Sequence, residues 1–384
     1  MMQPGSSVVL TAEMTLLVPP GTVIVLPGGR SLTLDATPNI LTPLVGSTVT
    51  VPANATGIPT AMIYTNVSVD SLPTAIAKVS LIAGSASRSK PSLDVDGVGT
   101  AATLFGFGHL ALDPSGDLYL QEGGSFRKVT ASGIVTHPWE FTRGYINMIE
   151  GIAVDSKGTI YGVGAAAQQG NQGNPVLINY VSSAGILSSI TNFLYVTGAR
   201  NMTLPSDPRG GLAVDSKGNL YYSDRSTNQI FMIASPTQSS RPVFSVFSGT
   251  GALGIVDGKF GSINAPKDMA FDGNDNLYVK CGNAIRKIAP DLTVTTFAAQ
   301  IPDMGDAIAV DRSGNVFVAS QVGILRIDPT GKRTSYPMAS VTGNNHTFDP
   351  GSIYTMVADN RGSVYVGVFL GVEVQGGQIY KVTY

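Results

Sequence analysis

Residues 210–235, GGLAVDSKGNLYYSDRSTNQIFMIAS, contain three short apolar runs separated by polar turns. The runs are residues 212–214, 220–222 and 230–233. Apolar runs of this length, separated by Asp, Gly and Asn residues, are typical of consecutive antiparallel strands. The stretch therefore predicts a three-stranded antiparallel unit.

The first turn of this unit, DSKGN, has residues suited to a tight reversal of the chain. The side chain of Asp215 can accept a hydrogen bond from the backbone two residues on. Gly218 adopts a positive φ without steric cost, and Asn219 tolerates one. A Ca²⁺ loop would need several carboxylates, so the aspartate of this turn is interpreted as a turn former.

The same unit recurs along most of the chain. The pattern of Asp, four residues, an apolar residue and an aromatic residue occurs six times, beginning at Asp113, Asp155, Asp215, Asp272, Asp311 and Asp359. Each copy lies between two further apolar runs, and fourth runs follow at residues 134–136, 243–247 and 292–297. Four strands per unit, repeated every ~40–60 residues, are typical of propeller blades. The sequence thus predicts an all-β, six-bladed β-propeller.

The chain ends at Tyr384, inside the third strand of the sixth unit, so this blade lacks an outer strand of its own. Residues 79–83 precede the first unit and resemble the outer strand at 243–247. We predict that residues 79–83 complete the last blade and close the ring, which removes an exposed sheet edge. An open six-unit array is the alternative.

These repeats resemble the NHL-repeat family of six-bladed propellers. The resemblance rests on the connection DGVGTAA at residues 96–102, on the D-x-x-G-N-[LIV]-Y turn, and on a Y-x-x-D-x-x-x-[NQ]-x-I step at residues 221–230. It covers residues 79–384 and implies the architecture while saying little of activity. Residues 278–281, YVKC, depart from the pattern, since they contain no acidic counterpart of Asp224.

Composition narrows the function classes. Charged residues make up 13% of the chain, about half of the roughly 25% that is typical of soluble domains. A net charge of −2 argues against electrostatic binding of nucleic acid or of an anionic membrane. The single Cys281 excludes an intrachain disulfide and a multi-cysteine metal site. No apolar stretch reaches the ~18 residues expected of a transmembrane helix.

Residues 1–75 differ from the rest of the chain, and the propeller is assigned to residues 76–384. Short strand-like runs occur at residues 8–10, 15–18, 22–26, 31–34, 47–51 and 61–64. Charged side chains are scarce among them, and Pro-Gly turns separate several of the runs. We interpret this region as a small β-rich domain for anchoring or assembly; a domain folded only around its own core is the alternative.

Two classes of enzymes with related propellers require metal-binding residues that can be looked for in this sequence. Peptidyl-hydroxyglycine lyases are similar in fold and use a zinc ion held by histidines. The histidines here, His109, His137 and His346, lie at different positions within the repeat. They are interpreted as unrelated surface or loop residues rather than as one zinc site.

Gluconolactonase-like propellers hold calcium at the central channel through carboxylates and Asn. The residues four or five before each turn aspartate begin the innermost strand, and this places Glu150, Asp268 and Asp306 around the axis as candidate metal ligands. Oxygen ligands suit Ca²⁺. The alternative is solvated or Lys-paired carboxylates, because Lys267 stands beside Asp268. No catalytic or cofactor-binding residue is assigned.

The main hypothesis from the sequence is a non-enzymatic structural or interaction protein. The propeller would be a display or receptor-binding platform, anchored by residues 1–75 in a larger, homo-oligomeric assembly. Low charge and a Gly/Thr/Ser-rich β N-terminus resemble phage tail and fibre proteins, and the N-terminus lacks the basic region of a signal peptide. The expected location is a virion or the extracellular space, with a host-surface receptor as a further partner. The alternative is a lactonase- or lyase-like enzyme with a divalent metal at the channel.

Overall fold

The structure is a computed structural model. It describes seven short strands between residues 7 and 65, and residues 77–85, 95–104, 108–122, 125–139, 149–165, 176–190, 210–237, 244–301, 304–320, 323–337, 353–369 and 376–384. The chain divides into two compact units, Met1–Leu72 and Pro73–Tyr384. Within the described ranges, no helix has the length and apolar character needed to cross a membrane.

The strands of the first unit form two antiparallel sheets. One has the order β1-β6-β3-β4 and the other the order β5-β2-β7. Their bounds are β1 Ser7–Val9, β2 Met14–Val18, β3 Val23–Val25, β4 Ser31–Thr33, β5 Asn39–Leu41, β6 Thr48–Thr50 and β7 Met62–Thr65. The sequence predicted six of these strands and missed β5, which stands between Pro38 and Pro43 at the edge of its sheet, where proline is tolerated.

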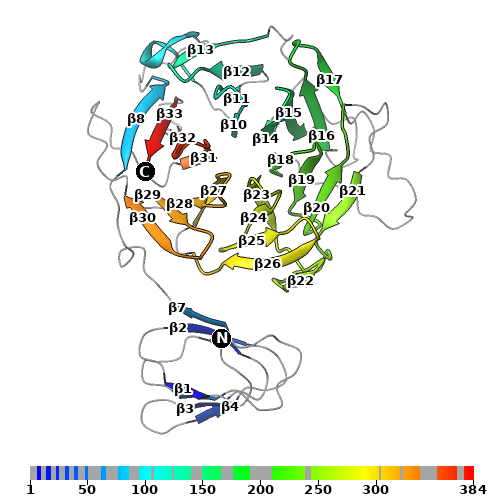
Figure 1. Ribbon diagram of the computed structural model, residues 1–384, viewed down its shortest axis with the longest axis vertical. Coiled ribbons are helices and arrows are strands. Elements are labelled where there is room, and N and C mark those ends of the chain that lie inside the picture. The colour runs from blue at the N-terminus through cyan, green and yellow to red at the C-terminus, as the bar shows by residue number, and fades with distance from the viewer. Residues whose placement is uncertain are drawn as a thin grey trace. The chain divides into compact units, whose positions relative to one another are not determined.

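The second unit is a ring of six antiparallel sheets around a central axis (Figure 1). The first three blades are β10 Leu110–Leu112, β11 Leu118–Glu122, β12 Ser125–Val129, β13 Ile134–Thr136 with β9 Gly97–Val98; β14 Ile149–Val154, β15 Ile160–Ala165, β16 Val176–Val181, β17 Leu187–Ser189; and β18 Leu212–Val214, β19 Leu220–Asp224, β20 Gln229–Ile233, β21 Phe244–Ser248. The innermost strands contact their neighbours all the way round, and β10 contacts β31. This confirms the predicted all-β, six-bladed propeller.

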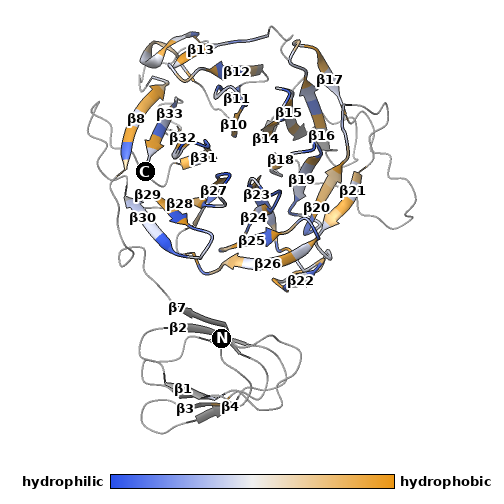
Figure 2. Ribbon diagram, viewed as in Figure 1, coloured by the Kyte–Doolittle hydropathy of each residue, from blue (hydrophilic) through white to orange (hydrophobic). Residues whose placement is uncertain are grey.

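The remaining three blades follow the same order from the axis outward. They are β23 Pro266–Phe271, β24 Leu277–Cys281, β25 Ala284–Ile288, β26 Thr293–Ala298 with β22 Gly258–Lys259; β27 Met304–Val310, β28 Val316–Ser320, β29 Gly323–Ile327, β30 Arg333–Pro337; and β31 Ile353–Ala358, β32 Ser363–Phe369, β33 Gly377–Thr383, β8 Lys78–Ala83. Apolar residues predominate in outer strands such as β8 and β21, whereas hydrophilic residues lie where β23 and β27 reach the centre (Figure 2).

Strand β8 closes the ring as the fourth strand of the sixth blade. It pairs antiparallel with β33, and the register places Val79 opposite Val382 and Ala83 opposite Ile379. Ala83 and Ile379 are fully buried in one core cluster with residues of the first blade. The predicted closure by residues 79–83 is therefore confirmed.

The turn aspartates explain the repeated sequence pattern. Asp215 Oδ1 accepts hydrogen bonds from the backbone amides of Lys217 (3.0 Å) and Asn219 (2.8 Å), and Oδ2 accepts one from the Tyr221 hydroxyl (3.0 Å). Gly218 has a φ of 82°, as expected. Asn219 does not need the positive φ that the sequence allowed it, because its side-chain amide instead donates to Asp215 Oδ2. One carboxylate thus fixes both the turn and the aromatic residue of the next strand.

Asp215→Ala is expected to destabilise the propeller by roughly 1–3 kcal/mol, because two turn amides, the Asn219 side-chain amide and one tyrosine hydroxyl lose their acceptor. Tyr221→Phe removes the hydroxyl alone and is expected to cost about 1 kcal/mol or less. Urea unfolding of both variants checks this order. Equal unfolding midpoints for Asp215→Ala and the unchanged protein would show that the carboxylate does not organise the turn.

Buried arginines hold the connections between blades. Arg286 is fully buried and donates to Asp257 Oδ1 (2.5 Å), to the Val256 carbonyl (2.8 Å) and to the Thr296 hydroxyl. In the first blade, Arg127 makes the equivalent ion pair with Asp96 (3.0 Å). In both blades, an arginine on the third strand therefore forms an ion pair with the aspartate of the Asp-Gly connection, the segment on which the NHL resemblance partly rests.

Candidate functional site

The polar end of the channel is built from irregularities of the innermost strands. In four blades the register of the innermost strand on the second strand shifts at the same point, directly before the apolar run. The residues at these shifts include Glu150, Lys267, Asp268, Asp306 and Tyr354. Bulges of this kind change the direction of a side chain and are frequent next to active sites. The repeat thus brings polar residues of several blades to one end of the channel, which we call the channel mouth.

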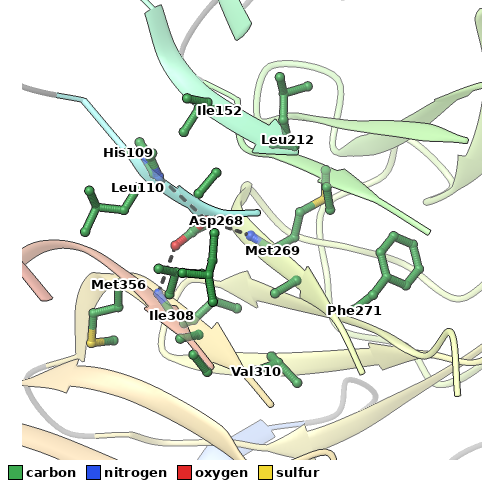
Figure 3. Close-up of a pocket in the computed structure, with 18 of the residues that line it drawn as sticks. His109, Leu110, Ile152, Leu212, Asp268, Met269, Phe271, Ile308, Val310 and Met356 are labelled. Carbon is green, nitrogen blue, oxygen red and sulfur yellow. Dashed lines mark hydrogen bonds and ion pairs between the residues drawn. The ribbon is translucent and has the colours of Figure 1, made fainter. Parts of the chain in front are cut away.

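His109 and Asp268 face each other across the channel mouth (Figure 3). His109 precedes β10 of the first blade, and its Nδ1 lies 3.8 Å from Asp268 Oδ1 on β23 of the fourth. The edge of the His109 ring also meets the ring of Tyr354, with 5.9 Å between the centroids. Three blades therefore contribute side chains to one cluster.

Asp268 is held rigidly by two backbone amides. Its Oδ1 accepts a hydrogen bond from Met269 (3.0 Å), and its Oδ2 accepts one from Ile308 of the neighbouring blade (2.9 Å). The side chain is only 12% exposed. Burial raises the pKa of Asp268, while His109 and the two amides oppose that rise. The carboxylate is thus fixed in position, with one oxygen directed toward the imidazole.

A second charge cluster lies beside the first. Lys267 Nζ and Lys280 Nζ each donate to a different oxygen of Asp306, both at 2.6 Å. Burial pushes the pKa of Asp306 upward, but the hydrogen bonds from the two lysines outweigh it and hold the pKa below its ordinary value. The ion pairs therefore keep the carboxylate of Asp306 charged.

Two cavities meet at the first cluster. The channel mouth is a cavity of about 180 Å³ that Arg225, Lys267, Asp306 and Tyr354 line together with His109 and Asp268. Deeper in the channel, a cavity of about 230 Å³ is lined by the innermost strands, whose residues there include Leu110, Ile152, Leu212, Met269, Ile308 and Met356. His109 and Asp268 line both cavities. A small molecule in the mouth would contact the imidazole and the cationic side chains at once.

The structure brings two of the three proposed metal ligands, Asp268 and Asp306, to the same cavity. Both are engaged with protein groups: Asp268 with amides and His109, and Asp306 with two lysines. Among the residues that the structure describes, no three His, Cys, Asp or Glu side chains form a group that could hold a metal ion. The side chain of Glu150 lies outside the described residues. The described carboxylates thus do not fit a calcium site, and the channel metal stays a prediction.

His109 is the site residue that the sequence interpretation passed over. Of the other two histidines, His137 lies at the outer part of the first blade, with its Nδ1 2.8 Å from Asp96, and His346 lies outside the described residues. The position of His109 was informative, because it stands directly before its apolar run as Asp268 does in the fourth blade. Lys280 was missed as well.

No model of a known protein family and no curated protein sequence matches this chain. Solved structures do resemble it. A structural genomics protein of unknown function from Bacteroides thetaiotaomicron is 14% identical, with a TM-score of 0.52, and the match covers 99% of this chain and 98% of that chain. At such low identity the likeness shows the fold alone. It agrees with the NHL-like propeller that the repeats predicted.

Two enzymes are among the other solved structures with this architecture. A streptogramin B lyase is 10% identical, with a TM-score of 0.49, over 80% of this chain and 97% of that one. A gluconolactonase from Xanthomonas campestris is 16% identical, with a TM-score of 0.49, over 73% of this chain and 89% of that one. These findings contradict the prediction of a non-enzymatic protein, which was wrong. The predicted oligomer, virion location and assembly role of residues 1–75 stay predictions.

The Asp306 cluster makes stability depend on pH. Because the pKa of Asp306 is lower in the folded chain, the unfolded chain binds the proton first as the pH falls. The stabilisation is present above the unfolded pKa of about 3.9 and is lost as the pH falls through the folded pKa. Asp306→Asn is therefore expected to cost about 1 kcal/mol at neutral pH and less near pH 3. Urea unfolding at both pH values checks this, and a cost independent of pH would contradict it.

Proposed function

We propose that this protein is an enzyme that transfers a proton to or from a small substrate bound at the channel mouth, as lactone hydrolysis and elimination reactions both require. The observation that supports the proposal best is the contact between His109 Nδ1 and the fixed carboxylate of Asp268. Histidine is the side chain most often used for acid–base catalysis near neutral pH. The pair lies where the mouth and the deeper cavity meet.

The carboxylate of Asp268 would orient the imidazole. At 3.8 Å the carboxylate lies beyond hydrogen-bond distance of Nδ1, so its negative charge would favour the tautomer that carries the proton on Nδ1, which leaves Nε2 with a free lone pair. His109 would then accept a proton from water or from a substrate C–H group through Nε2 and return it to the leaving group. Asp268 acts through His109 and is therefore a positioning residue.

The cationic side chains of the mouth would stabilise negative charge that develops during the reaction. Lys267 and Arg225 line the same cavity as His109. Positive groups that are already in place at a partly buried site stabilise an oxyanion or an enolate more strongly than water does.

The test is turnover of two substrate panels: lactones and aryl esters for hydrolysis, and carbonyl compounds with a β leaving group for elimination. His109→Gln is expected to lower turnover at least ~100-fold. His137→Gln is the matched control and is expected to leave turnover unchanged, because His137 contacts Asp96 away from the channel. Equal turnover by His109→Gln and the unchanged protein, or no turnover of either panel, would overturn the proposal.

A further inference from the structure

We infer that Lys267 and Lys280 form a receptor for the carboxylate or phosphate group of a small ligand. In the structure the carboxylate of Asp306 occupies this receptor in place of the ligand's anion. The inference rests on the proposed function, since it names the chemical class of molecule that the channel mouth would accept. It concerns binding, and its test does not depend on turnover.

The first support is the geometry of the two lysines. Each ammonium group binds a separate oxygen of the same carboxylate at 2.6 Å. Two cations that hold the two oxygens of one anion are suited to any carboxylate or phosphate group, whichever molecule carries it. The geometry is thus that of an anion site, occupied here by a side chain of the protein.

The second support is the contrast in burial between the partners. Lys280 lies on the second strand of the fourth blade and is only 7% exposed, whereas the side chain of Asp306 is 64% exposed. A buried ammonium group without an anion costs folding free energy, so the Lys280 ammonium group needs a negatively charged partner at this point. The anion that pairs with Lys280 in the structure is the carboxylate of Asp306. Because this carboxylate is exposed to solvent, a ligand anion can reach the lysines and replace it.

The third support is the backbone around Asp306. The register of β27 on β28 shifts between Met304 and Ile308, so that Asp306 lies outside the regular pairing of these strands. Asp306 therefore lies in a bulge, where the direction of a side chain is not set by regular pairing. A ligand anion that takes the place of the Asp306 carboxylate would supply the lysines with the negative charge that they need.

The fourth support is the position of the receptor. Lys267 and Asp306 line the same cavity as His109 and Asp268. An anionic group held by the lysines would therefore place the rest of the ligand beside the imidazole. Arg225 lines this cavity too and would favour a doubly charged phosphate over a carboxylate.

Isothermal titration calorimetry with propionate and with inorganic phosphate tests the inference on the full chain. Asp306→Asn removes the negative charge that neutralises the receptor, and the variant is expected to bind at least one of the two anions about tenfold more tightly, or more, than the unchanged protein. The double variant Asp306→Asn/Lys280→Met is expected to lose that gain. If Asp306→Asn binds phosphate more tightly than propionate, the receptor prefers a phosphate group. If it binds propionate more tightly, the receptor prefers a carboxylate group.

Asp291→Asn is the matched control, because it changes the net charge by the same amount at the exposed β25–β26 turn. If Asp306→Asn binds neither anion more tightly than Asp291→Asn does, the inference is wrong. His109→Gln is expected to keep the anion affinity of the unchanged protein. Loss of turnover in His109→Gln without any gain of anion binding in Asp306→Asn would leave the proposed function standing and remove only the anion receptor.

Discussion

A chain lacking residues 1–84 is expected to be less stable than one lacking residues 1–72 by about 5 kcal/mol or more, which corresponds to a fall in Tm of roughly 10 °C or more. The two truncations differ by strand β8, Lys78–Ala83, which supplies the outer strand of the sixth blade. Without β8, the edge of β33 is exposed along its length. The buried contacts of Ala83 with the first blade are lost as well.

Thermal unfolding and size-exclusion chromatography of the two truncated chains provide the measurement. The shorter chain is expected to associate through the open edge of β33, because an unpaired edge strand is a template for pairing with another chain. The longer chain retains β8 and serves as the control. Equal melting temperatures for the two truncations would mean that β8 does not close the ring.

Arg286→Ala is expected to destabilise the propeller by about 3–5 kcal/mol. Arg286 is fully buried and is shared by the Asp257 carboxylate, the Val256 carbonyl and the Thr296 hydroxyl. Its removal leaves a partly buried carboxylate without its cation and creates a cavity between the connection and the third strand. The loss should be visible as a lower urea midpoint.

Arg312→Ala is the control, because this arginine is exposed on the next blade and its removal should change the stability by about 0.5 kcal/mol or less. Asp257→Asn supplies a second check. If the ion pair stabilises the propeller, the double variant Arg286→Ala/Asp257→Asn loses less unfolding free energy than the sum of the losses in the two single variants. Additive costs would contradict the assigned role of the pair.

The architecture could be predicted because its determinants are local and repeated. The turn around Asp215 needs only residues within six positions of the carboxylate, from Lys217 to Tyr221. The closing strand was also predictable, since residues 79–83 resemble the outer strand at 243–247 but precede the first repeat unit, and the sixth unit lacks an outer strand of its own. Strand β5 was missed because it is short and flanked by prolines, which weaken the sequence pattern of a strand.

The site could be predicted only in part. The sequence placed Asp268 and Asp306 at the end of the channel, and both line the channel mouth. The partners that decide their chemistry come from other strands: His109 from the first blade and Lys280 from the strand after β23. These pairings depend on how the ring closes and on the bulges of the inner strands. The repeat pattern carries neither piece of information.

The mistaken prediction of a non-enzymatic protein has the same physical origin. The sequence shows no activated nucleophile, no paired acid and base residues and no metal ligands at recognisable spacings. His109 and Asp268 are separated by about half of the propeller along the chain, yet their side chains lie 3.8 Å apart. A propeller ring assembles its centre from one short strand of every blade, so the residues of one site need have no spacing in common.

Histidine ring NMR of the full chain tests the central claim most directly, because the protein has only three histidines. Lactones, esters and small carboxylates would be added in turn to protein with isotope-labelled histidine. If the channel mouth is the functional site, at least one of these ligands shifts the ring signals of His109 and leaves those of His137 in place. If His109 stays unchanged throughout, or if only another histidine responds, the channel mouth is not the site.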